Sequence, residues 1–83
     1  MARTRKDAAH KVAGENLDHM MLPGQEKEKA EQLARHFLDG DPAPDGVTQH
    51  IRDRAEYAVR EGIDHAYGDT MPDDIKNRLD EQS

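Results

Sequence analysis

Clusters of helix-breaking residues divide this chain of 83 residues into four segments, and they constrain its fold more than any other feature. The first cluster is Pro23 and Gly24, the second is residues 39–46 with two prolines and two glycines, and Gly68 marks the third. Proline and glycine are the strongest local interruptions of a helix. Between the clusters, apolar residues recur at spacings of three and four, which is the helical period. The pattern predicts an all-α fold, a small helical bundle of three main helices plus a short C-terminal helix.

Residues suited to helix ends support this division. Thr4 is placed to cap the first helix, with Asp7 in the capping-box position, and Thr70 is placed to cap the fourth helix, with Asp73 at its third residue. Gly40 is suited to end the second helix in a left-handed conformation. The predicted helices run from about Arg5 to Met21, Gln25 to Asp39, Val47 or Thr48 to Tyr67, and Met71 to Glu81.

Two glycines lie inside the predicted helices. Gly14 falls in the first helix, where glycine costs about 1 kcal/mol relative to alanine. We expect that it lets another helix approach closely. Gly62 falls in the third segment, and it leaves open whether that segment is one helix or two.

The chain is long enough for one domain and poor in apolar residues. Hydrophobic residues make up 34% of it, against roughly 45–50% in typical domains. We expect either a small core that closes on itself or a core completed by a partner or a second copy. We predict a flexible basic arm over residues 1–4, a single helical domain over residues 5–81 and a tail at residues 82–83. The predicted core is Val12, Leu17, Met20, Leu33, Phe37, Leu38, Ile51, Ala55, Val59, Ile63, Ile75 and Leu79.

Composition excludes several classes of protein. The chain has no cysteine, which excludes a disulfide scaffold and a cysteine-based zinc site. It has no apolar run of the roughly 20 residues that a membrane span needs. Its N-terminus lacks the apolar stretch of a secretory signal, so we expect a cytoplasmic protein without a membrane partner.

The sequence does not indicate an enzyme. Serine occurs only at Ser83, so a serine-based triad is excluded, and the glycines at 40 and 46 lie among acidic residues that would repel a phosphate. A minimal bundle of short aliphatic side chains rarely encloses a pocket that shifts pKa values. We expect no catalytic residues, no cofactor and no metal ligands.

Exposed apolar side chains favour a protein-binding module, such as a regulator, inhibitor or adaptor. Tyr57 lies opposite the apolar face of the third helix, and tyrosine is enriched at binding hot spots. Residues 64–83 carry six acidic and two basic side chains, which can dock on a basic partner. We predict that an acidic helical surface binds another protein, or a second copy. The predicted partner-binding residues are Tyr57, Met20, Met21, Tyr67, Asp64 and Asp69.

Two alternatives remain open. Residues 1–11 carry four basic residues and one acidic residue, whereas residues 12–83 carry 8 basic and 17 acidic ones. The basic end could contact nucleic acid through Arg3, Arg5 and Lys6, with dimerisation bringing two such arms together. The second alternative is a response to metal or pH through histidine, the commonest metal ligand. No pair of the five histidines has the i, i+4 spacing of a zinc-binding helix.

Overall fold

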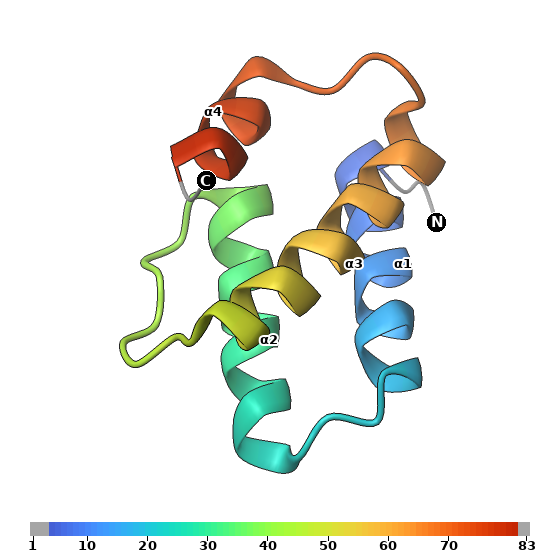
Figure 1. Ribbon diagram of the computed structural model, residues 1–83. Helices are drawn as coiled ribbons and strands as arrows, with labels where there is room; N and C mark the ends of the chain where they lie inside the picture. Colours follow the sequence, from blue (N-terminus) through green and yellow to red (C-terminus); the bar gives the residue numbers. More distant parts are fainter. Residues whose placement is uncertain (1–3, 82–83) are drawn as a thin grey trace.

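The computed structural model describes residues 4–81 and shows an all-helical bundle, which confirms the predicted fold class. The helices α1 (Arg5–His19) and α2 (Gly24–Asp39) run in opposite directions, and α3 (Gln49–Tyr67) crosses them both (Figure 1). The short α4 (Asp73–Glu81) lies against α2. Residues 1–3 and 82–83, which include most of the predicted arm and the whole predicted tail, lie outside the described residues.

Capping side chains fix where two of the helices begin. The Thr4 hydroxyl accepts a hydrogen bond from the Asp7 amide at 3.1 Å, and the Asp7 carboxylate accepts one from the Thr4 amide at 3.3 Å. This is the predicted capping box, and it satisfies two amides that have no partner within the helix. The Thr48 hydroxyl accepts from the Ile51 amide in the same way at the start of α3.

The C-terminal ends of α1 and α2 differ. Gly40 follows α2 with a φ of 82°, the left-handed conformation that the sequence predicts for it. α1 ends at His19, two residues earlier than predicted, because the chain turns at Met20 and Met21.

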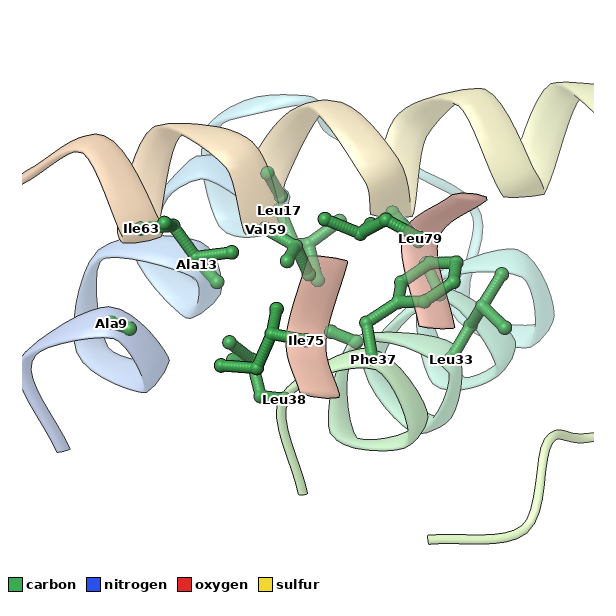
Figure 2. Packing of buried hydrophobic residues seen from close by; sticks show 14 of the residues in the cluster. Ala9, Ala13, Leu17, Leu33, Phe37, Leu38, Val59, Ile63, Ile75 and Leu79 are labelled. Carbon is green, nitrogen blue, oxygen red and sulfur yellow. The ribbon is translucent and has the colours of Figure 1, made fainter. Parts of the chain in front are cut away.

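The core lies where all four helices meet (Figure 2). The prediction that Val12 and Met20 belong to the core is wrong, because both side chains are only half-buried. α1 buries Ala9 and Ala13 together with the predicted Leu17, so its buried stripe is narrower than the apolar pattern suggests. The buried residues are Ala9, Ala13, Leu17, Ala30, Leu33, Ala34, Phe37, Leu38, Ile51, Ala55, Ala58, Val59, Ile63, Ile75 and Leu79.

Gly62 sets the distance between α1 and α3, which share the most extensive contact in the bundle. A Cβ atom at Gly62 would clash with the backbone carbonyl oxygen of Ala9, and it would lie 3.2 Å from the carbonyl carbon. α3 is continuous through Gly62, so this glycine does not split the helix. The prediction that Gly14 permits a close approach is wrong, since a Cβ there would meet nothing within 4 Å.

α4 begins at Asp73, and the prediction that Thr70 caps it is wrong. The Thr70 hydroxyl instead donates to the Tyr67 carbonyl oxygen at 2.6 Å, so it serves the turn that follows α3. The Pro72 carbonyl oxygen accepts the Lys76 amide at 3.0 Å, which places Pro72 just before the first turn of α4.

Candidate functional site

Tyr57 is the most exposed aromatic side chain of the described residues. It lies on α3 with 56% of its surface accessible, whereas Phe37 is fully buried and Tyr67 is half-buried. The predicted exposure of Tyr57 is confirmed. It follows from the helical wheel, because Ile51, Ala55 and Val59 direct the apolar face of α3 into the core.

Charged residues surround Tyr57 on the outside of α3. Residues three or four apart are neighbours on a helix surface, and Asp64 lies two turns from Tyr57 on the same side. Asp53 accepts a hydrogen bond from the Gln49 side chain at 2.8 Å, which holds its carboxylate on this side of the helix. We define the Tyr57 face as the exposed residues Asp53, Arg54, Tyr57, Arg60, Glu61 and Asp64. Three of these residues are acidic and two are basic, so the Tyr57 face has a net negative charge.

The other predicted partner-binding residues are on different elements. Met21 lies in the connection from α1 to α2, where it is 86% exposed. Its φ of 55° is uncommon for a residue with a side chain. Met20, beside it, is half-buried against the core. These two residues therefore do not form a joint apolar patch.

Tyr67 and Asp69 flank the end of α3. Tyr67 packs against the core, and its carbonyl oxygen accepts hydrogen bonds from both the amide and the hydroxyl of Thr70. Asp69 is exposed in the segment between α3 and α4. Of the predicted partner-binding residues, the structure thus brings Tyr57 and Asp64 onto one face, and it gives Tyr67 a structural role.

The residues proposed for nucleic-acid contact are only partly described. Arg5 is exposed and Lys6 is half-buried, both in the first turn of α1, whereas Arg3 lies outside the described residues. The nucleic-acid alternative stays a prediction.

The histidines make contacts between elements rather than a joint site. The ring Nε2 of His10 lies 2.9 Å from a carboxylate oxygen of Asp39, and that of His50 lies 3.5 Å from one of Glu26. His36 donates from Nδ1 to the Asp41 carbonyl oxygen at 2.6 Å. His36 is half-buried, whereas His19 is exposed. Over residues 4–81, no three histidine, aspartate or glutamate side chains are placed to hold a metal ion.

A groove between α1 and α2 brings together charged side chains. It is lined by His10, Glu31 and Arg35 above Ala13, Gly14, Leu17 and Ala34, and its volume is about 200 Å³. Small-molecule sites usually have volumes of roughly 300–1,000 Å³. His10 is already engaged with Asp39, and the lining contains no buried charged side chain. The groove is therefore smaller than a usual small-molecule site, and its histidine already has a partner.

Comparison with protein families, with curated proteins and with solved structures found no match to this chain. Within residues 4–81, none of the helices is long and apolar enough to cross a membrane. The Tyr57 face is the arrangement of predicted site residues that the geometry supports best.

Proposed function

We propose that the protein is a small, non-enzymatic binding module that docks on another protein through the Tyr57 face. The observation that carries this proposal is the 56% exposure of Tyr57 at the centre of a charged helix surface. A tyrosine ring supplies a large contact area at a low cost in side-chain entropy. Such rings are frequent among the few residues that contribute most of the binding energy.

The charge of the Tyr57 face supports a basic partner. Asp53, Glu61 and Asp64 outnumber Arg54 and Arg60, and the whole chain carries a net charge of −6. Like charges disfavour the association of two copies, whereas opposite charges steer a partner into place. The proposed partner is therefore a different protein, with an apolar depression for the tyrosine ring inside a basic rim.

A photo-crosslinking amino acid at position 57 tests this proposal in cells that express the chain. The matched control carries the same amino acid at Glu28, which is exposed on the outside of α2. We expect one dominant adduct with a second protein from position 57 and none from position 28. Equal adducts from both positions would contradict a specific face, and an adduct between two copies of the chain would contradict a different partner.

The variant Tyr57→Ala separates binding from folding. Because the side chain is exposed, we expect the free energy of unfolding to change by no more than about 0.5 kcal/mol. The crosslinked partner should no longer copurify with the variant, and its copurification with the wild type should weaken as salt is raised. A variant that unfolds, or that retains the partner, would argue against the proposed role of Tyr57.

A further inference from the structure

α4 depends on docking for its helical form. It has nine residues, and isolated helices shorter than about 12–15 residues are marginal in water. Residues 68–72 connect it to α3 without helical structure, along a path that crosses the top of the bundle in Figure 1. α4 therefore folds where it docks, and an undocked α4 would lose its helix.

Two apolar side chains attach α4 to the bundle. Ile75 and Leu79 lie one turn apart, each is 1% exposed, and they are the residues of α4 that are buried. Figure 2 shows them in one cluster with Leu33, Phe37 and Leu38 of α2. The remaining core residues all belong to α1, α2 and α3, so these three helices keep a common core of their own.

Arg78 supplies the polar part of the attachment. Its guanidinium donates from Nε to the Phe37 carbonyl oxygen at 2.9 Å and from Nη2 to the Leu38 carbonyl oxygen at 3.1 Å. These carbonyls belong to the last turn of α2, where no helical amide follows to bond them. A cation at this end also complements the helix dipole. One side chain therefore caps α2 and holds α4 in place.

The surroundings of Arg78 fit this double role. Nη2 also donates to the Asp74 carboxylate, one turn back on α4, at 3.0 Å. A Cβ at Gly40 would lie 3.4 Å from Nη1, which places the guanidinium beside the glycine that ends α2.

We propose that α4 is a latch, which detaches and unfolds while the body formed by α1, α2 and α3 stays folded, and that Arg78 holds this latch closed. Opening would uncover Phe37 and Leu38 at the end of α2, together with the carbonyl groups that Arg78 caps. The protein would thus have a closed state and an open state that differ in exposed apolar surface. This inference is independent of the Tyr57 face, because it concerns α2 and α4 rather than the outside of α3.

Hydrogen exchange of the full chain across low urea concentrations tests the latch. We expect the amides of α4 to exchange at least about tenfold faster than those around Val59 in α3, because α4 opens without global unfolding. Their exchange should also depend little on urea, since detachment exposes little surface compared with unfolding of the whole chain. Equal rates with equal urea dependence in α3 and α4 would overturn the proposal.

The variant Arg78→Ala tests whether Arg78 holds the latch closed. It should raise the exchange of α4 amides by about tenfold, because it removes hydrogen bonds from a charged donor, and it should leave α1 and α3 unchanged. Arg54→Ala, which removes an exposed arginine from α3, is the control and should alter α4 exchange little. If Arg78→Ala instead speeds exchange equally in all helices, Arg78 is part of the body and the latch is wrong. If that variant does not fold, the urea series on the wild-type protein still tests whether α4 opens without global unfolding.

Discussion

The contact between α1 and α3 and the contact between α2 and α4 are built in opposite ways. At Gly62 the two long helices approach so closely that the backbone of α3 meets the backbone of α1 at Ala9. α4 instead contacts α2 through the side chains of Ile75, Arg78 and Leu79. At Gly62 the first contact leaves no room for an added atom, whereas the second contact depends on a few side chains.

This difference indicates which of the two helix contacts can separate more easily. Close-packed backbones resist any added volume, since the interior of a protein has few voids into which atoms can shift. In the proposed latch, α4 is released while α1, α2 and α3 stay packed together, and the release uncovers Phe37 and Leu38 of α2. Three predictions test this contrast.

Truncating one matched leucine in each region should give the largest difference. Leu17 in α1 and Leu79 in α4 are both 1% exposed. Leu17→Ala should lower the free energy of unfolding by about 2–5 kcal/mol, the usual cost of a cavity in a core. Leu79→Ala should cost clearly less, because the loss cannot exceed what the docking of α4 contributes. Urea denaturation followed by circular dichroism measures both, and equal losses would contradict the contrast.

Adding one methyl group to each internal glycine should give a smaller effect of opposite sign at the two positions. Gly62→Ala forces a Cβ against the Ala9 carbonyl group, and overpacking of this kind costs about 1–3 kcal/mol. Gly14→Ala meets nothing within 4 Å, so the better helix propensity of alanine should stabilise the protein by up to about 1 kcal/mol. Thermal or urea unfolding of both variants provides the comparison, and a stabilised Gly62→Ala variant would be incompatible with the close contact.

Acid should weaken the α4 contact through Asp74, with the smallest effect of the three. The hydrogen bond from Arg78 lowers the pKa of the Asp74 carboxyl below its ordinary value of 3.8. A group with a lowered pKa in the folded state stabilises the protein above its ordinary pKa, and this contribution is lost as the pH falls through the folded value. The Asp74 side chain is 60% exposed, so solvent screens the pair.

The pH dependence is measured as the shift in urea midpoint between pH 7 and pH 3. Asp74→Asn should show a smaller shift than the wild type, because it lacks the titrating group. Asp69→Asn removes an exposed carboxylate from the α3–α4 connection and serves as the control. Identical shifts in the wild type and Asp74→Asn would show that the pair does not contribute.

Local rules predicted the helices and most of their ends. The capping box at Thr4 and the left-handed Gly40 depend on residues within four positions, which a sequence displays directly. The same local rules gave a wrong prediction at Thr70, because its hydroxyl donates a hydrogen bond back to Tyr67 and does not cap α4. A threonine between two helices can bond to the end of the first helix or cap the start of the second. Which of the two it does depends on the path of the chain between them.

The contacts that connect distant segments could not be predicted in this way. Arg78 bonds to carbonyls 40 and 41 residues away, and only its place beside Leu79 on the apolar side of α4 hinted at a partner. Gly14 and Gly62 are both glycines within apolar helical patterns, and the close approach was assigned to the wrong one. Which of them faces a neighbouring helix depends on how the helices cross. The exposure of Tyr57 was predicted correctly, because it follows from the face of one helix.

The close approach of α3 to α1 can be tested most directly by a nuclear Overhauser measurement on the full chain. A Cβ at Gly62 would lie 3.4 Å from the amide nitrogen of Ala13, so the α proton of Gly62 that points in this direction lies close to the Ala13 amide proton. We predict a cross-peak between a Gly62 α proton and that amide proton. A spectrum that shows other cross-peaks between α1 and α3 but lacks this one would contradict the close backbone contact.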